Sequence, residues 1–420
     1  MNTLDFEQKM KAYADLAIHV GLNLQKGQRL LIRGPLVYGA PISAAPLILA
    51  ITKSAYQAGA RLVDVMWGDE QTELLRFQYA PRDSFEEVSG WKTDGPYEHV
   101  KRGDAVISIS GINPDLLKGQ DPDLVSLYTT SIWKKLDPFL KVTSNNNVNW
   151  LVLSVPTPGW SVKVFPNLTP GERESKMWET IFKLCRLDQA DPIAAWKAHV
   201  KHLEARSKYL NEKRFSYFHY TGPGTDFTVG FPDGVLWVAA SEKTSTGISF
   251  IANIPTEEVF TLPHKDRAEG VIHSSLPLNF GGTLIDDFSL RFEGGRVVNA
   301  SAKVGESVLQ KMIATDDGSC RLGEVAIVPY SSPISQSGLL FYNTLLDENA
   351  ACHLALGNAY QTTLKGGGSL SDDEFKAAGG NVSVLHVDFM VGSNQVNIDG
   401  ILPDGRTEPV LRSGDWAVDV

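Results

Sequence analysis

The pattern of apolar residues changes near residue 212 and divides this chain of 420 residues into two parts. Before that point, short strand-like runs alternate with longer runs whose apolar residues recur at helical spacing. After it, short apolar runs separated by Gly, Asp and Asn turns predominate. The first pattern is typical of a mostly parallel sheet covered by helices on both faces, and the second of antiparallel sheets. We therefore expect an α/β N-terminal domain followed by a β-rich α+β C-terminal domain.

The boundaries of the expected elements follow from this division. In the first part, helices are predicted over residues 4–22 and 42–58, and strands over 28–34, 61–67, 104–111 and 149–156. Two charged helical patterns in residues 170–211 meet at Asp188–Pro192 and are expected to link the halves. We place the N-terminal domain at residues 1–190, with linking helices to about 211, and the second domain at residues 191–420.

Four further elements are predicted in the second part. The stretch FEGGRVV indicates a hairpin with Gly294–Gly295 in its turn, and GVLWVAA at 234–240 and VSVLHVDFMVG at 382–392 indicate strands. The alanine-rich run at 350–360 predicts a helix, which Asp347 or Asn349 could cap.

Composition argues against several classes of protein. The formal charge of −10 gives no general attraction to phosphate backbones, so we expect no nucleic-acid partner. The only cysteines, Cys185, Cys320 and Cys352, are far apart and favour a reducing compartment. We find no secretory pattern and no apolar run of about 18 residues, so we expect no membrane span and a cytoplasmic protein.

Motifs of several common enzyme classes are missing. The turn after the first predicted strand reads RGPLVYGA, which lacks GxGxxG, and GxxxxGK[ST] does not occur, so a nucleotide site rests on fold analogy alone. There is no GxSxG elbow and no HExxH. Cys352 precedes His353, but neighbours on a helix point about 100° apart and would not form a nucleophile–base pair.

Ionisable side chains interrupt four apolar segments of the second part, where an unpaired charge is costly. Glu257 and Glu258 lie in NIPTEEVFTLP, and Glu324 in CRLGEVAIVPY. Each could also be a solvated surface acid, since glutamate is mostly exposed. His386 and Asp388 in LHVDFM share one face of a strand, which suits two ligands of one metal, although the aspartate could simply orient a core histidine.

The fourth segment is DENAACHLALGNAY, which starts at Asp347. His353 and Tyr360 are seven residues apart and would share one face of the predicted helix, with Glu348 near its start. His353 alone could be a core histidine with its hydrogen bonds satisfied. Together the four segments supply four carboxylates and two imidazoles, more than a single catalytic zinc uses. This set suits two divalent ions about 3.5–4 Å apart with a bridging carboxylate, and such ligands accept Zn, Co, Mn or Mg.

At these segments the sequence resembles the thermophilic aminopeptidase family, the metallopeptidases typified by aminopeptidase T and aminopeptidase S. The resemblance rests on NIPTEEVFTLPH, RLGEVAIVP, DENxxxHxALGxxY and HxDFM, in the family's order, and extends from the first helix to GDWAV. It implies an N-terminal α/β domain, a β-rich catalytic domain, a homodimer with an enclosed cavity, and two divalent metals, Zn or Co first, with Mn or Mg as alternatives. The implied metal ligands are Glu258, Glu324 (the bridge), Glu348, His353, His386 and Asp388, and the active-site tyrosine is Tyr360.

The resemblance also implies the reaction, release of N-terminal residues from peptides with a free amino terminus. In the expected mechanism, a water or hydroxide bridging two metals attacks the first peptide bond, Tyr360 stabilises the oxyanion, and Glu257 is the candidate general base. Two alternatives stay open: a two-metal hydrolase of another amide or a phosphoester, and a non-catalytic metal-binding protein.

Overall fold

The computed structural model describes residues 3–35, 38–280 and 283–419, which form two compact units. The first unit contains Met1–His199 and Ser241–Pro255, and the second contains Val200–Ala240 and Thr256–Val420. Leu36 and Val37, in the segment RGPLVYGA, lie outside the described residues. None of the described helices is both long and apolar enough to cross a membrane.

The first unit is built on a parallel sheet of five strands in the order β11-β6-β5-β1-β3. Its strands are β1 (Arg29–Arg33), β3 (Leu62–Val65), β5 (Ala105–Ser110), β6 (Trp150–Ser154) and β11 (Asn253–Ile254). The first four confirm the strands predicted for this part of the chain, with slightly shorter bounds. Two short pairs accompany the sheet: β2 (Ala40–Pro41) with β4 (Trp67–Gly68), and β9 (Ser241–Lys243) with β10 (Ser249–Ile251).

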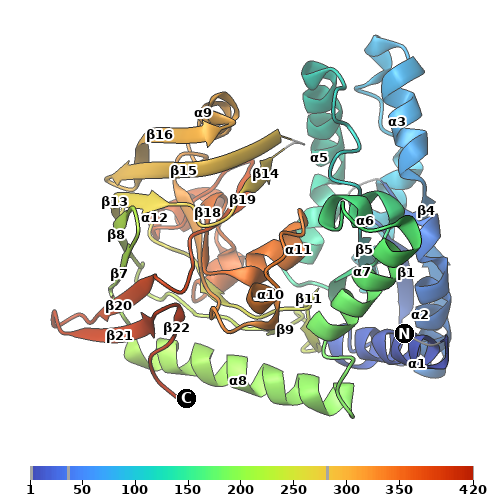
Figure 1. The fold of residues 1–420 in the computed structure, drawn as a ribbon. Helices are drawn as coiled ribbons and strands as arrows, with labels where there is room; N and C mark the ends of the chain where they lie inside the picture. Colours follow the sequence, from blue (N-terminus) through green and yellow to red (C-terminus); the bar gives the residue numbers. More distant parts are fainter. Residues whose placement is uncertain (1–2, 36–37, 281–282, 420) are drawn as a thin grey trace. The chain divides into compact units, whose positions relative to one another are not determined.

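Helices connect the strands of this sheet, as the alternating pattern predicts (Figure 1). They are α1 (Thr3–Leu16), α2 (Ala45–Gln57), α3 (Glu70–Tyr79), α4 (Asp94–Lys101), α5 (Pro122–Ser144), α6 (Pro158–Val164) and α7 (Pro170–Leu184). One face of the sheet packs through Leu31 and Val106 against Val100 of α4 and Phe139 of α5. The long helix α8 (Pro192–Lys213) begins at a proline, as expected, and continues into the second unit.

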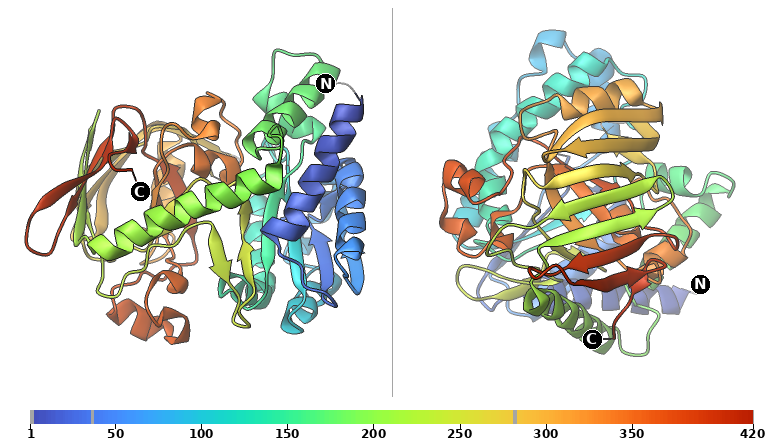
Figure 2. Two further views of the ribbon diagram at one scale, coloured as in Figure 1. Left: turned by 90° about the horizontal axis from the view of Figure 1, so that it is seen from below. Right: turned by 90° about the vertical axis from the view of Figure 1, so that its left-hand side faces the viewer.

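The second unit contains two antiparallel sheets. The smaller has the order β12-β17-β18-β19, with strands Val259–Thr261, Leu322–Ile327, His353–Gly357 and His386–Met390. The larger is seen face-on in the right-hand view of Figure 2. Its order is β14-β15-β13-β8-β7-β20-β21-β22, and β16 pairs with β15. In chain order its strands are Tyr217–Gly222, Thr225–Gly230, Ala268–His273, Leu278–Phe280, Thr283–Glu293, Arg296–Val304, Asn397–Ile401, Thr407–Arg412 and Asp415–Trp416.

The α/β and β-rich division of the chain is confirmed, but three details differ from the sequence prediction. The segment 241–255 returns to the first unit, because β11 extends the parallel sheet beside β6. Residues 234–240 form only isolated bridges, through Val235 and Val238, and no strand. The predicted helix over 350–360 is wrong, since His353–Gly357 is strand β18, paired on both sides with β17 and β19.

Candidate metal centre

The predicted site residues gather on one face of the smaller sheet. Strand register places Glu324 of β17, Ala355 of β18 and Asp388 of β19 in one row across the sheet. The adjacent pairs are Ala326 with His353 and Gly357 with His386. Directly paired residues share a face of an antiparallel sheet, so the ionisable side chains stand beside the small side chains of this face. The small residues leave room above the sheet for the carboxylates and imidazoles.

The opposite face of this sheet is apolar and anchors it. Leu354 and Phe389 pair across β18 and β19, and Phe389 packs against Phe288 of β15 with ring centroids 5.7 Å apart. This alternation explains the sequence HLALG: His353 and Ala355 face the site, and Leu354 and Leu356 face the core. The prediction of a helix here was wrong for two reasons. Both faces of this strand are buried, so its sequence does not alternate between polar and apolar residues as a half-exposed strand does. Pairing with the neighbouring strands also outweighed the helix preference of alanine.

Two groups of candidate ligand atoms share one carboxylate. Within each group the atoms lie within 4.8 Å of one another: Glu258, Glu324 and His353 form the first, and Glu324, His386 and Asp388 the second. Nε2 of His353 lies 3.2 Å from Glu258 Oε2 and 3.4 Å from Glu324 Oε1. Nε2 of His386 lies 3.3 Å from Asp388 Oδ1 and 3.6 Å from Glu324 Oε2. We call these five residues the acid–imidazole cluster. Glu324 lies at its centre, the position expected for a bridging carboxylate.

The adjacent acids Glu257 and Glu258 lie in an irregular segment between β11 and β12. The Ile254–Pro255 peptide bond that precedes them is cis. Strand alternation does not apply in this segment, and both glutamates are buried. Glu258 joins the acid–imidazole cluster, whereas the charge of Glu257 acts on Arg206 of α8. The surface-loop alternative for these acids is therefore wrong.

Two other predicted residues lie beside the cluster. Glu348 belongs to the 3₁₀ turn Glu348–Ala350 before β18, and its charge interacts with Glu258, Glu324 and Asp388. Among the described residues, it and Glu257 are not part of either group of closely spaced atoms. The Tyr360 ring follows β18 and lies 4.9 Å from the His386 ring, centroid to centroid. Although the residue is partly exposed, desolvation of its hydroxyl, followed by the site's carboxylates, raises the pKa of Tyr360 well above its usual range.

Backbone carbonyls orient both imidazoles. Nδ1 of His353 lies 3.1 Å from the carbonyl oxygen of Ala351, and Nδ1 of His386 lies 2.7 Å from that of Asn358. Such a contact places a proton on Nδ1, so Nε2, which faces the carboxylates, can offer its lone pair to a metal once its own proton is lost, as in metal-bound histidines. Gly323, next to Glu324, is needed here, because a Cβ would lie 2.4 Å from the carbonyl oxygen of Asn358.

Protonation in the cluster reflects its excess of acids. Burial lowers the pKa of a histidine, but the carboxylates of Glu258 and Glu324 outweigh it and raise the pKa of His353 well above its usual range. Neighbouring acids likewise raise the pKa of His386 to about 9, against the effect of burial. Burial also raises the pKa of Glu348 well above its usual range. Imidazoles that bind a metal must first lose these protons, so metal binding here releases protons.

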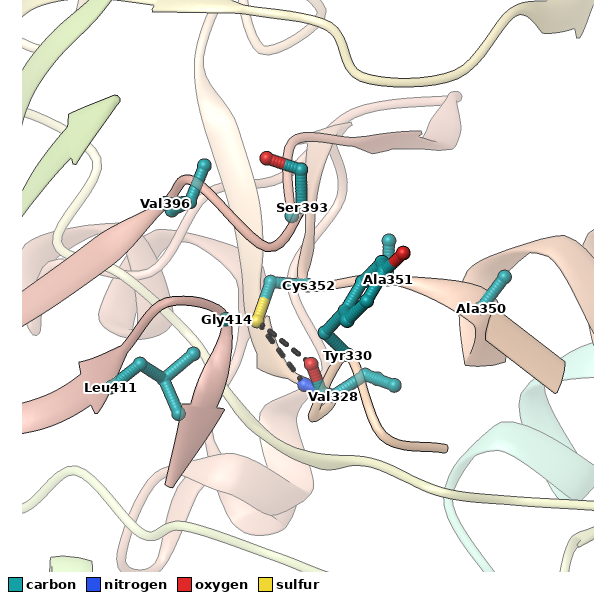
Figure 3. A pocket seen from close by; sticks show the side chains of 10 residues that line it. Val328, Tyr330, Ala350, Ala351, Cys352, Ser393, Val396, Leu411 and Gly414 are labelled. Carbon is teal, nitrogen blue, oxygen red and sulfur yellow. Dashed lines mark hydrogen bonds between the residues drawn. The ribbon is translucent and has the colours of Figure 1, made fainter. Parts of the chain in front are cut away.

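Cys352 directly precedes His353 but does not belong to the acid–imidazole cluster. Its thiol donates a hydrogen bond to the carbonyl oxygen of Val328 at 3.1 Å, and burial raises its pKa to about 11. Figure 3 shows the thiol directed at Val328 within a small pocket that is also lined by Tyr330, Val396 and Leu411. A buried thiol that keeps its proton is not a nucleophile at neutral pH.

Comparison with known proteins identifies the family. The model of the family described as thermophilic metalloprotease (M29) matches residues 6–416. The chain belongs to this family. Among M29-like relatives, aminopeptidase 2 of Geobacillus stearothermophilus is 44% identical over 99% of both chains. Aminopeptidase T of Thermus thermophilus is 41% identical over 98% of this chain and 99% of its own. The solved structure of wild-type AmpT from Thermus thermophilus matches with a TM-score of 0.92 and 39% identity, over 98% of this chain and 100% of that one.

Membership of the M29 metalloproteases implies a divalent metal, and the cluster fits one. Glu258 Oε2 and Asp388 Oδ1 are buried acceptors without a well-formed hydrogen bond to any described residue, yet each lies close to a histidine Nε2. Acceptors and imidazole lone pairs that converge in this way are the donor set of Zn, Co or Mn. The resemblance found in the sequence is thus confirmed, and with it a metal-dependent peptidase.

Sequence reasoning missed the residues that support this cluster. Asn349 was expected only as a helix cap, but its side chain contacts Glu257 and Glu348. The carbonyl of Asn358 and the missing side chain of Gly323 were not considered. Two local signals could have indicated such supporting residues. In LGEV a glycine directly precedes the acid, and in DEN an asparagine directly follows the acid.

Proposed function

We propose that this chain is a two-metal aminopeptidase that removes the N-terminal residue of peptides. The observation that carries the proposal is the sharing of Glu324 by two groups of candidate ligands. One cation would be held by Glu258, Glu324 and His353, and the second by Glu324, His386 and Asp388, with Glu348 beside both. The metal is proposed to be Zn or Co, with Mn or Mg as alternatives. When bound, the cations would supply Lewis-acid polarisation of the scissile carbonyl and an activated water.

The chain's own residues divide the remaining chemistry. Tyr360 keeps its phenolic proton at neutral pH, so it can donate a hydrogen bond to the oxyanion that develops on the substrate carbonyl. Glu257 is proposed to take the proton of the attacking water and to pass it to the leaving amine. The names of the M29 relatives, aminopeptidase 2 and aminopeptidase T, support a peptide with a free amino terminus as the substrate.

Metal reconstitution tests the proposal directly. The protein is stripped with EDTA, and Zn, Co, Mn or Mg is added back singly while hydrolysis of leucine-p-nitroanilide is followed. We expect activity to return with metal and to be maximal near two equivalents. Activity on p-nitrophenyl phosphate in place of the anilide would favour the phosphoester alternative. Two bound equivalents with no hydrolysis of either substrate would contradict the proposal.

The adjacent acids Glu257 and Glu258 form a matched pair that separates base from ligand. Glu258→Gln should lower metal content and activity together, because it removes a charged ligand. Glu257→Gln should keep full metal content and lower kcat by about 10²–10⁴-fold, the usual contribution of a general base. Metal analysis and steady-state kinetics of both variants decide the assignment. Wild-type kcat in Glu257→Gln would exclude Glu257 as the base.

A homodimer and a cytoplasmic location are proposed on the family resemblance. The location is supported by Cys185, Cys320 and Cys352, which are all buried and form no disulfide, as expected in a reducing compartment. Light scattering after size-exclusion chromatography tests the dimer. A monomer of 46.0 kDa at micromolar concentration would contradict it.

A further inference from the structure

Asn349 is a fully buried amide in the 3₁₀ turn that carries Glu348. It lies four residues before His353 and has 0% exposure, although asparagine is mostly exposed in proteins. A buried amide is costly unless its donors and acceptor are all used, so its contacts indicate why the residue is there.

The amide oxygen of Asn349 binds the segment that carries the candidate base. Oδ1 accepts a hydrogen bond from the backbone N–H of Glu257 at 2.6 Å. This bond joins residues 92 positions apart in the chain. It holds the backbone immediately before Glu258, in a segment that belongs to no strand or helix. The placement of both adjacent acids therefore depends on a side chain from another part of the chain.

The amide nitrogen of Asn349 binds its own turn. Nδ2 donates to the carbonyl oxygen of Leu345 at 3.0 Å and lies 3.5 Å from Oε1 of Glu348, a longer and weaker contact. Because the oxygen must face a backbone N–H and the nitrogen a carbonyl, only one orientation of the amide satisfies all three partners. The Asn349 carbonyl in turn accepts from Ser332 Oγ at 3.2 Å, which fixes the turn itself.

We propose that Asn349 is a positioning residue that sets the distance between the Glu257–Glu258 pair and Glu348. The inference rests on the proposed function, because it assigns those acids to the metal centre. One planar amide spans the two acidic segments. Removing it frees the Glu257 segment to move relative to Glu348, and it leaves a buried N–H and a buried carbonyl without their partner. Supporting residues of this kind typically contribute about 10–100-fold to metal affinity or activity.

The chain offers a matched control for this substitution. Asn211 of α8 accepts a hydrogen bond from the Trp237 backbone N–H at 2.9 Å and donates one to the Trp237 carbonyl at 2.8 Å. It thus bonds one backbone N–H and one backbone carbonyl, as Asn349 does, but its partner is not a candidate metal residue. Asn211→Ala reports the cost of losing such an amide when only the fold is affected.

The experiment compares Asn349→Ala, Asn211→Ala and the wild type in three measurements. Co²⁺ affinity is measured by titrating the metal-free protein and following visible absorption, Tm is measured without metal, and kcat and KM are measured with saturating metal. We expect Asn349→Ala to bind Co²⁺ about 10–100-fold more weakly. We also expect its kcat to fall by a larger factor than its KM changes. We expect Asn211→Ala to lower Tm while Co²⁺ affinity and kcat stay within about twofold of wild type.

Several results would overturn the inference. Asn349→Ala with wild-type Co²⁺ affinity and kcat, whatever its Tm, would reduce Asn349 to a structural role, as would an equal loss of Co²⁺ affinity in Asn211→Ala. If Asn349→Ala does not fold, Asn349→Ser keeps a shorter hydrogen-bonding side chain and should show a smaller loss in the same direction. The proposed function fails separately, if the wild type binds Co²⁺ but cleaves no aminoacyl anilide. In that case, Co²⁺ affinity alone still decides the role of Asn349.

Discussion

Strand β5 in the parallel sheet of the first unit and strand β17 in the smaller sheet of the second are both largely buried, yet they hold different side chains. In β5 the buried positions hold Ala105, Val106, Ile107 and Ile109. In β17 all six residues are buried, and one of them is Glu324. Burial of the apolar side chains of β5 is stabilising without any further partner. Burial of acids costs free energy unless the charges are compensated.

The difference shows what the smaller sheet still requires. Its face collects the acids Glu258, Glu324 and Asp388, with Glu348 beside them, and two imidazoles to balance them. Four ionised acids would carry a charge of −4, and imidazoles that bind a metal are neutral. In the proposed two-metal site, two divalent cations would compensate that charge. The apolar side chains of β5 need no further partner, whereas the buried acids of the second sheet would be compensated in full by bound cations.

Glu324→Gln is the most severe test of this contrast. It removes the charge shared by both groups of ligands, so we expect metal content to fall and kcat/KM to drop by about 10³-fold or more, since a bound metal contributes several kcal/mol. Atomic absorption and kinetics measure the two effects. Glu293→Gln, at an exposed acid of β15, is the control and should change neither. Normal metal content in Glu324→Gln would show that the cluster does not bind the metals.

The matched change in the parallel sheet is Ile107→Ala. Ile107 is fully buried and pairs with Ile32 and Leu151, so its truncation should cost about 2–5 kcal/mol of unfolding free energy. Metal content and kcat of the folded fraction should be unchanged, because no candidate ligand lies in this unit among the described residues. Urea unfolding and metal analysis check this. Loss of metal without loss of stability would contradict the assignment of the site to the second unit alone.

Tyr360→Phe probes chemistry without changing the charge of the cluster. Loss of one donor to a developing oxyanion typically lowers kcat by about 10²–10³-fold. The ring contacts with His386 and Phe260 are kept, so metal content and Tm should stay at wild-type values. A variant with full kcat would assign the oxyanion contact to another group.

Cys352→Ala should have the smallest effect. The thiol is hydrogen-bonded to the Val328 carbonyl and not to the cluster. We therefore expect the free energy of unfolding to fall by about 1 kcal/mol and kcat to change by no more than about twofold. Thermal unfolding and a thiol-independent activity assay measure both. If this variant is inactive at full metal content, Cys352 is again a candidate catalytic group.

The sequence predicted the architecture well because its two periodicities are strong. Alternating strands and helices specified the parallel sheet, and the turn at Gly294–Gly295 specified the hairpin of β15 and β16. Most of the predicted ligands lie together for a related reason, since an acid inside an apolar run needs a partner. Glu258, Glu324, His353, His386 and Asp388 do come together.

What the sequence did not reveal depends on contacts between distant segments. The run around His353 was predicted as a helix, because its strand character comes from pairing with β17 and β19. The bond between Asn349 and the Glu257 backbone joins segments whose proximity no local pattern indicates. The return of Asn253–Ile254 to the first unit likewise needs the partner strand β6 to be explained.

Because β11 joins the parallel sheet from a distant part of the chain, the order of protein synthesis affects how this sheet folds. β6 ends at Ser154 and β11 begins at Asn253, so 98 residues (155–252) are made between the two strands. At about 5–20 residues per second, the ribosome needs about 5–20 s to supply them. Throughout that interval the edge of β6 that Asn253 and Ile254 will cover is unpaired, and an open strand edge invites association with other chains. The nascent first half must therefore wait for part of the second, and a chain truncated near His199 would keep that edge exposed.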